Sequence, residues 1–399
     1  MKEELIEAYN SLVKLNIPSK ISQNKFIVHF IDGAFLEVKG DNQNKYKVVM
    51  SNSDSGQVIH STIITNNMWT RTNIKYFVKW DVKVYEESTN ELVFEHLYNP
   101  KGKRVYIHFD SSAIGDTLAW FPYVKEFKEK WECDIIVSTF KNDWFKKEYP
   151  EFEFVKPGEN IHNLYAMYGV GWYYTDEGDV KLNLNPRDFK PNPLQQTATD
   201  ILGLEYKEIK PKISLSNKKR PIEHKYVVIA PHASAHAKYW NYPGGWQTII
   251  DYLNNKGYRV MTITNEKLGD KFHDSKLGGK LKRVINMTGP LDIKERMNQI
   301  KHADLFIGVG SGLSWISWAL GTKTILVSGF SLPETEFEDC ERIYPEKGIC
   351  KGCFNRIRLD PGDWEWCPVF KNTPRQYECT KTITPDKIIE KIEKLWKNN

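Results

Sequence analysis

The sequence has little that would mark a nucleic-acid-binding, secreted or membrane-spanning chain. Its 399 residues include 56 lysines and arginines against 51 aspartates and glutamates, and these charges are scattered, so no basic block predicts nucleic acid or an anionic membrane. Segment 1–16 lacks the apolar core of a secretory leader. Segment 305–322 carries no charge, but its glycines and an internal turn argue against a membrane helix. We therefore expect a cytoplasmic protein without membrane insertion and without a nucleic-acid partner.

Two familiar motifs are also missing. The chain contains no Asp-x-Asp, the usual carboxylate pair for a catalytic divalent ion, so no such metal is expected. A classical dinucleotide fingerprint would need glycine where Leu313 stands, which weakens a dehydrogenase interpretation.

What the chain does have is a β-loop-α-β unit in segment 304–329, DLFIGVGSGLSWISWALGTKTILVSG. The pattern predicts a strand at 305–307, a helix at 313–320 and a second strand at 324–328. Three glycines in the turn would let the backbone approach a ligand, and the helix start offers unpaired N–H groups. Such a turn suits a diphosphate, with donors at Ser311, Gly312 and Leu313. The alternative is a tightly packed turn that binds nothing.

The length predicts two to three domains at about 150 residues each. Residues 1–103 read as a helix followed by a small antiparallel β domain, because short alternating runs are punctuated by turns. Residues 104–215 and 216–399 each alternate strand and helix. The predicted fold class is therefore α/β, with two Rossmann-like domains facing across a cleft behind the β domain.

Two local predictions concern aromatic segments. In the β domain, 77–80 reads as a strand, and Trp69 and Trp80 as core residues or cross-strand partners. Segment 165–189 reads as one hairpin with its turn at 176–179.

Asp116 is the candidate general base. It follows Gly115 at a predicted helix start, in the loop after the strand 105–109, where open α/β sheets place their ligand crevices. The alternative is an ordinary carboxylate that interacts favourably with the positive end of the helix dipole and has no catalytic role. Asp110 is the second candidate.

Lys238 is the candidate anion-binding cation. It lies in the loop 231–240 after the strand 226–230, and an ammonium group there can act as a point charge for phosphate.

The last fifth of the chain contains a candidate metal site. A C-x₂-C pair, Cys350 and Cys353, is followed by Cys367 and Cys379, and four thiolates can complete a tetrahedron around one structural ion. Sulfur ligation suits iron or Zn²⁺ alike, and free thiols or disulfides are the alternatives. Two other cysteines, Cys133 and Cys340, fall outside the pattern.

Several of these motifs together resemble a known family. Segments 112–117 (SAIGDT), 231–238 (PHASAHAK) and 308–314 (GVGSGLS), with the terminal cysteines, are similar to glycosyltransferases of the two-Rossmann-domain (GT-B) type in the bacterial heptosyltransferase family. The match is nearest to the branch that heptosylates autotransporter proteins, and it covers Arg104 to the end of the chain. Heptosyltransferases that build lipopolysaccharide usually carry aspartate and histidine where this chain has Gly310 and Trp315.

The resemblance implies inverting transfer of heptose from ADP-heptose to serine hydroxyls of an autotransporter passenger, in the cytoplasm, with Asp116 as the base. It implies that 104–215 is the acceptor and catalytic domain, and that 216–399 is the nucleotide-sugar domain ending in a metal finger and a terminal helix. The donor-binding residues that it implies, together with those argued above, are Thr117, Ser234, Lys238, Glu266, Met287, Gly289, Ser311, Gly312 and Leu313. Ser234 and Glu266 would approach phosphate or ribose, and Met287 and Gly289 the adenine.

The resemblance also implies one iron per chain in the cysteine finger, with zinc as the other option. It implies a large ring-shaped homo-oligomer, for which the hairpin near 165–174 and the β domain would supply contact surface. Two alternatives stay open: a related glycosyltransferase that uses another nucleotide sugar, and a non-catalytic nucleotide-binding or metal-finger interaction module.

Overall fold

The computed structural model describes residues 15–18, 25–215 and 219–397, so the predicted N-terminal helix lies outside the described part. The chain forms two compact units. Unit 1 comprises Met1–Ser112, Trp120–Phe189 and Gln196–Lys207; unit 2 comprises Ala113–Ala119, Lys190–Gln195 and Glu208–Asn399. The domain boundaries predicted at 103/104 and 215/216 stay predictions.

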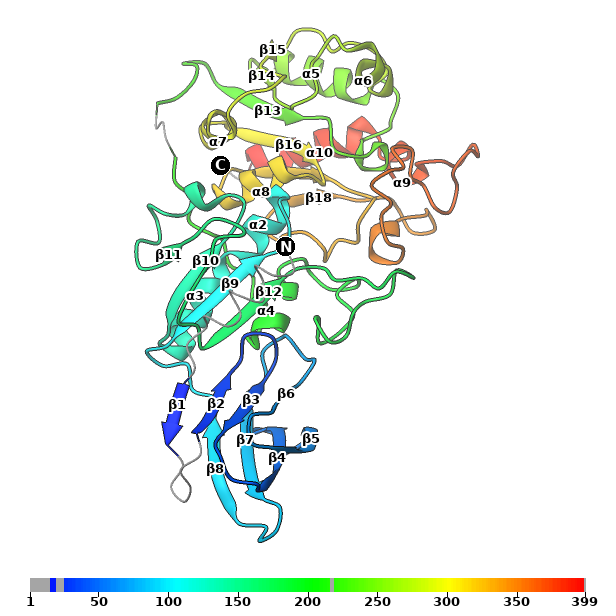
Figure 1. Ribbon diagram of the computed structural model, residues 1–399. Helices are drawn as coiled ribbons and strands as arrows, with labels where there is room; N and C mark the ends of the chain where they lie inside the picture. The colour runs from blue at the N-terminus through cyan, green and yellow to red at the C-terminus, as the bar shows by residue number, and fades with distance from the viewer. Residues whose placement is uncertain (1–14, 19–24, 216–218, 398–399) are drawn as a thin grey trace. The chain divides into compact units, whose positions relative to one another are not determined.

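Two antiparallel sheets form the first part of unit 1 (Figure 1, blue and cyan). In spatial order, one contains β1 (Leu15–Pro18), β2 (Lys25–His29), β3 (Phe35–Lys39) and β6 (Trp69–Arg71). The other contains β5 (Val58–Thr65), β4 (Lys45–Asn52), β7 (Trp80–Glu86) and β8 (Leu92–Leu97). The alternation seen in the sequence sets their faces, because every second side chain of β4, from Tyr46 through Val48 to Met50, is buried.

The aromatic residues of this region are placed largely as expected. Trp80 is buried, and Trp69 stacks on Phe35 of the paired strand with ring centroids 5.6 Å apart. The strand predicted at 77–80 begins only at Trp80. The reason is that the Phe77 N–H donates to the Ile201 carbonyl at 2.8 Å instead of to a neighbouring strand.

The second part of unit 1 is a parallel sheet. Its order is β11 (Glu153–Phe154), β10 (Asp134–Ser138), β9 (Arg104–Phe109) and β12 (Ala166–Val170). Its helices are α3 (Pro122–Trp131), which contacts β10, and α4 (Gln196–Leu202), which contacts β12; a short 3₁₀ helix, η1 (Asn142–Trp144), follows β10.

The hairpin predicted over 165–189 is right at its turn and wrong at its first arm. The Thr175 N–H donates to the Asp179 carbonyl at 2.7 Å, and Tyr174 forms a single antiparallel bridge with Val180. The preceding residues instead form β12, which pairs in parallel with β9. Tyr165 and Tyr168 are buried in unit 1, so these two rings belong to the core and cannot supply the oligomer contact suggested for them.

Unit 2 is built on a six-stranded parallel sheet (Figure 1, green to orange). Its order is β15 (Ile285–Asn286), β14 (Arg259–Thr262), β13 (Tyr226–Ala230), β16 (Leu305–Val309), β17 (Thr324–Val327) and β18 (Glu341–Ile343). Every residue of the central strands β13 and β16 is buried, as continuous apolar runs predict for parallel strands covered on both faces.

Two pairs of helices pack with this sheet. One pair is α5 (Gly245–Asn255) and α10 (Pro385–Lys397), which contact each other and reach β14, β17 and β18; the other is α7 (Ile293–Lys301) and α8 (Gly312–Ala319), of which α8 lies on β16 and β17. The remaining short elements are α2 (Ile114–Trp120), η2 (His236–Lys238), α6 (Lys271–Lys276), η3 (Cys353–Asn355) and α9 (Glu378–Lys381). No helix within the described ranges has the length and apolar character needed to cross a membrane.

Candidate functional site

The turn between β16 and α8 is crowded rather than conformationally strained. Gly308, Gly310 and Gly312 all have φ outside the left-handed region. A Cβ on Gly312 would lie 2.6 Å from Cβ of Ile114, and one on Gly308 would lie 2.6 Å from the Phe306 ring. Close packing therefore explains two of the three glycines, and it brings the start of α2 against the start of α8.

A cavity of about 330 Å³ opens beside this turn. Its walls come from the loops that follow β13, β14, β15 and β16, and from the starts of α2, α7 and α8. They are Ile114, His232, Ala233, Ser234, Thr264, Asn265, Glu266, Gly289, Leu291, Ile293, Arg296, Ser311, Gly312 and Leu313. This is the carboxyl edge of a parallel sheet, where such folds bind ligands.

Six of the nine predicted donor-binding residues line this cavity: Ser234, Glu266, Gly289, Ser311, Gly312 and Leu313. Gly289 has φ 101°, a conformation that side chains rarely allow, so a glycine is required there. Thr117 and Met287 do not line the cavity. The Thr117 hydroxyl donates to the Ala113 carbonyl of its own helical turn at 2.9 Å.

Two polar atoms in the cavity wall are available to a ligand. Among the described residues, Ser311 Oγ and His232 Nε2 are buried and make no hydrogen bond, and unpaired buried groups are costly unless something else binds them. His232 Nδ1 bonds Thr264 Oγ1 at 2.9 Å, and burial together with the nearby His273 lowers the His232 pKa to about 4. His232 is therefore a neutral imidazole with one nitrogen available to a ligand.

Arg296 shapes the same wall, although no sequence motif singles it out. Its buried guanidinium donates to the carbonyls of Met287, Gly289 at 2.7 Å and Thr264 at 3.2 Å. Burial lowers its pKa. Met287 thus takes part through its carbonyl, which Arg296 holds, so the loop after β15 is fixed in place.

Lys238 lies at the end of η2, next to the cavity. Its ammonium donates to Ser234 Oγ at 3.3 Å and lies 5.3 Å from the centre of the Phe330 ring. Burial lowers the Lys238 pKa, while the charges of Asp116 and Glu336 raise it. Two carboxylates therefore accompany this ammonium group, and one of them is the predicted base.

Asp116 is half-buried in the first turn of α2 and belongs to unit 2. A Cβ on the preceding Gly115 would lie 2.9 Å from the Trp315 ring, so α2 is held tightly against α8. Asp110, the second candidate, is exposed and belongs to unit 1.

The four clustered cysteines lie within electrostatic range of one another. Burial and the neighbouring thiols of Cys353, Cys367 and Cys350 raise the Cys379 pKa to about 12. Within the described ranges, however, no group of three or more His, Cys, Asp or Glu side chains is arranged to hold a metal ion. The donor chemistry fits a sulfur-bound cation, because such an ion would offset the cost of gathering these thiolates. The ligand set stays a prediction.

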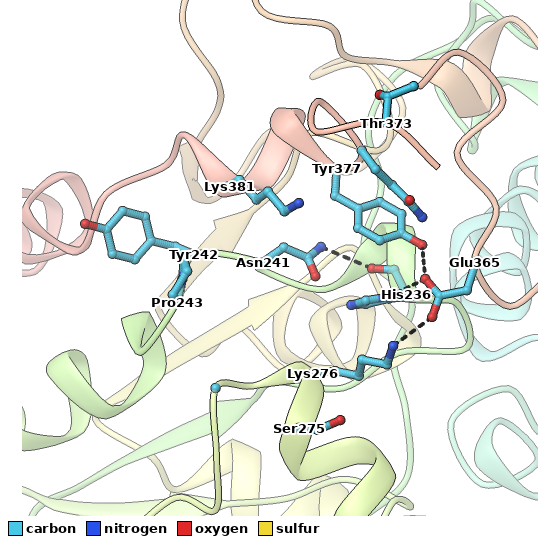
Figure 2. A pocket seen from close by; sticks show the side chains of 12 residues that line it. His236, Asn241, Tyr242, Pro243, Ser275, Lys276, Glu365, Thr373, Tyr377 and Lys381 are labelled. Carbon is cyan, nitrogen blue, oxygen red and sulfur yellow. Dashed lines mark hydrogen bonds and ion pairs between the residues drawn. The ribbon is translucent and has the colours of Figure 1, made fainter. Parts of the chain in front are cut away.

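A second cavity, of about 370 Å³, borders the cysteine segment (Figure 2). At its centre, Glu365 accepts hydrogen bonds from His236 Nδ1 at 2.8 Å, Lys276 Nζ at 2.8 Å and Tyr377 Oη at 2.6 Å. Burial would raise the Glu365 pKa, but these partners lower it to about 2. The network ties the residue two positions before Cys367 to η2, the element that ends in Lys238.

Comparisons with known proteins identify the family of the chain. The family model for glycosyltransferase family 9 (heptosyltransferase) matches residues 194–335. The autotransporter heptosyltransferase BAHTCr of Citrobacter rodentium is 33% identical over 387 residues, covering 95% of this chain and 91% of that protein. The autotransporter heptosyltransferase TibC of Escherichia coli O78:H11 is 32% identical over 386 residues, covering 95% and 91%.

Two solved structures of TibC are also similar. The crystal structure of TibC from enterotoxigenic E. coli, described as an iron-containing dodecameric glycosyltransferase, has a TM-score of 0.84 at 32% identity, covering 97% of this chain and all of that one. TibC in complex with ADP-D-β-D-heptose has a TM-score of 0.83 at 31% identity, covering 95% and 97%.

Proposed function

The chain belongs to the autotransporter heptosyltransferases of glycosyltransferase family 9, and from this premise we propose that it transfers heptose from ADP-heptose to serine hydroxyls of an autotransporter passenger, in the cytoplasm before export. Its fold is of the GT-B type, with antiparallel sheets in the N-terminal region. The proposal rests on the cavity at the carboxyl ends of β13 to β16, whose wall holds the unpaired Ser311 and His232 atoms beside Lys238.

In the proposed complex, the nucleoside occupies this cavity and its base lies against the apolar side chains of Leu291, Ile293 and Leu313. The diphosphate lies at the start of α8, where the first N–H groups have no partner within the helix. Lys238 adds a positive charge at the same end. The sequence has no Asp-x-Asp pair for a divalent ion. In this proposal the negative charge of the leaving diphosphate is therefore stabilised by Lys238 and by the helix N–H groups.

The proposed reaction is a single displacement. The serine oxygen forms a bond to the anomeric carbon while the bond from that carbon to the diphosphate oxygen breaks, and ADP leaves with the electron pair. Attack opposite to the leaving group inverts the anomeric centre. The Asp116 carboxylate accepts the hydroxyl proton as the new bond forms.

A thermal-shift comparison of nucleotide sugars tests the proposal. ADP-heptose and ADP should raise the melting temperature, because a ligand that binds only the folded state stabilises it. The UDP-, GDP- and CMP-sugars should not. Stabilisation by UDP compounds alone would point to the related glycosyltransferase instead. Binding of ADP-heptose without hydrolysis or transfer would point to the non-catalytic module.

Lys238→Ala should remove most of the ADP-induced shift and weaken calorimetric ADP affinity by roughly 10–100-fold, the usual cost of losing a hydrogen bond to a charged group. Lys282→Ala, an exposed lysine of unit 2 outside the cavity wall, is the matched control and should bind ADP normally. Unchanged affinity in Lys238→Ala would remove this residue from the diphosphate site.

We also propose that the cysteine finger, Cys350, Cys353, Cys367 and Cys379, holds one structural iron or zinc per chain. The support is the proximity of the four thiols and the iron-containing description of TibC. Four protein ligands would leave no open position for a substrate, so the ion would order the finger and take no part in the transfer.

Self-assembly is the remaining proposal, since TibC is described as dodecameric. The antiparallel sheets expose large apolar side chains that suit a second copy of the chain, including Val58, Ile63 and Trp69, each at least half exposed. Light scattering should give a multiple of the 46.6 kDa chain mass. Ile63→Lys, on the edge strand β5, should reduce the number of chains in the assembly, whereas Leu182→Lys, at an even more exposed position elsewhere, should not. A monomer at micromolar concentration would refute assembly.

A further inference from the structure

Gly310 is the one glycine of the β16–α8 turn that faces a charged group. Its φ lies outside the left-handed region, so its backbone would accept other residues. A Cβ at this position would instead lie 2.9 Å from Oε1 of Glu336. The absence of a side chain at 310 therefore makes room for a carboxylate that comes from a distant part of unit 2.

Glu336 is held in a fixed orientation. It is 9% exposed. Ser331 Oγ donates to Oε1, and Arg342 Nη1 donates to Oε2 at 2.9 Å. Arg342 is itself fixed by a second bond to the Phe337 carbonyl at 2.8 Å. A carboxylate oxygen can accept two hydrogen bonds, so each oxygen of Glu336 keeps one acceptor position after these contacts.

Glu336 lies near Lys238 and the turn before α8. Its charge acts on Lys238, as does that of Asp116, and Lys238 bonds Ser234 in the cavity wall. Ser311, next to Gly310, also lines that wall. Glu336 itself is not part of the cavity lining, but it faces Gly310, the neighbour of the wall residue Ser311, at the end where we place the diphosphate and therefore the sugar.

We propose that Glu336 is a sugar-recognition residue, whose carboxylate accepts hydrogen bonds from hydroxyl groups of the bound donor sugar across the space left open by Gly310. The inference rests on the proposed function for the donor, but it concerns the sugar and not the nucleotide. A carboxylate suits this task because sugar hydroxyls are donors and a charged acceptor strengthens the bond. The competing explanation is a structural ion pair with Arg342.

The test compares two affinities in each variant, for ADP and for ADP-heptose. Glu336→Gln keeps the shape and, at a pH low enough for Lys238 to stay charged, should leave ADP affinity within about twofold, while weakening ADP-heptose roughly 10–100-fold, as expected for a lost charged hydrogen bond. Glu341→Gln is the control, because this glutamate also pairs with a cation, Lys391 at 2.9 Å, but lies on β18. Its ratio of affinities should equal that of the wild type.

A second pair of variants separates recognition from folding. Gly310→Asp alone places two carboxylates in one space and should weaken ADP-heptose binding. Gly310→Asp combined with Glu336→Ala returns one carboxylate to that space from the other side, so part of the sugar affinity should recover. Recovery without a matching gain in melting temperature supports recognition.

Two results in the Glu336→Gln variant would overturn the inference, and a third in the wild-type protein would do so as well. One is an unchanged ratio of ADP-heptose to ADP affinity in Glu336→Gln, and the other is a loss in which both affinities fall together with the melting temperature. A wild-type protein that binds ADP-heptose no better than ADP would reject a sugar contribution at this site, whatever Glu336 does. The proposed function fails separately, if the wild-type protein binds neither compound.

Discussion

Replacing Asp116 by asparagine should lower heptose transfer by roughly 10²–10⁴-fold, the usual contribution of a general base. The amide fills the same space but cannot take the serine proton. ADP-heptose should still bind, because the proposed nucleoside and diphosphate contacts come from the cavity wall, α8 and Lys238. Single-turnover transfer to the acceptor, measured beside calorimetric donor affinity, separates the two effects.

The same variant has a second expected signature. The Asp116 charge raises the Lys238 pKa against the lowering effect of burial, so removing that charge should lower the pKa further. The ammonium form is then lost at a lower pH. ADP affinity should therefore fall as the pH rises, and this fall should begin at a lower pH in Asp116→Asn than in the wild type.

Asp110→Asn is the matched control, since Asp110 is a carboxylate six residues earlier, in the loop after β9, and belongs to unit 1. It should keep most of the transfer rate. Near-normal turnover in Asp116→Asn would refute the assignment, and loss confined to Asp110→Asn would move the base to that residue.

The sequence predicted local elements of the site better than the contacts between them. The β-loop-α-β unit forms as expected, with β16 at Leu305–Val309 and α8 at Gly312–Ala319, because an apolar run and three glycines determine it locally. The reason why glycine is needed at these positions could not be predicted from the local sequence. Gly312 makes room for Ile114 and Gly310 for Glu336, and both partners are distant in the sequence.

The same limit explains the residues that were missed. Arg296 is one basic residue on an otherwise ordinary helix, and its role appears only when the loops after β14 and β15 bring their carbonyls to it. The parallel pairing of β12 with β9 is likewise a long-range contact. An aromatic run that ends in a turn can be the arm of a hairpin or a parallel strand followed by a turn, so the sequence alone did not identify β9 as the partner of β12.

Replacing Cys367 by serine should remove the metal and loosen the finger. Its core is small, made mainly of Phe330, Trp366 and Tyr377 with Ala237, so much of its order would come from the ion. Elemental analysis of protein purified without a histidine tag should find about one iron or zinc per chain, as four sulfur ligands bind one ion. Cys367→Ser should lose it, whereas Cys340→Ser, outside the set, should keep it.

Loss of the metal should also weaken ADP binding at the donor site, because Glu365 joins the finger to η2 through His236. If the finger loosens, this network no longer fixes the segment that ends in Lys238, and ADP affinity should fall in Cys367→Ser although no donor-binding residue has changed. Glu365→Gln should weaken ADP binding while retaining the metal, since this side chain is not one of the four sulfur ligands. A metal-free Cys367→Ser protein with the melting temperature and ADP affinity of the wild type would show that the finger neither needs an ion nor supports Lys238.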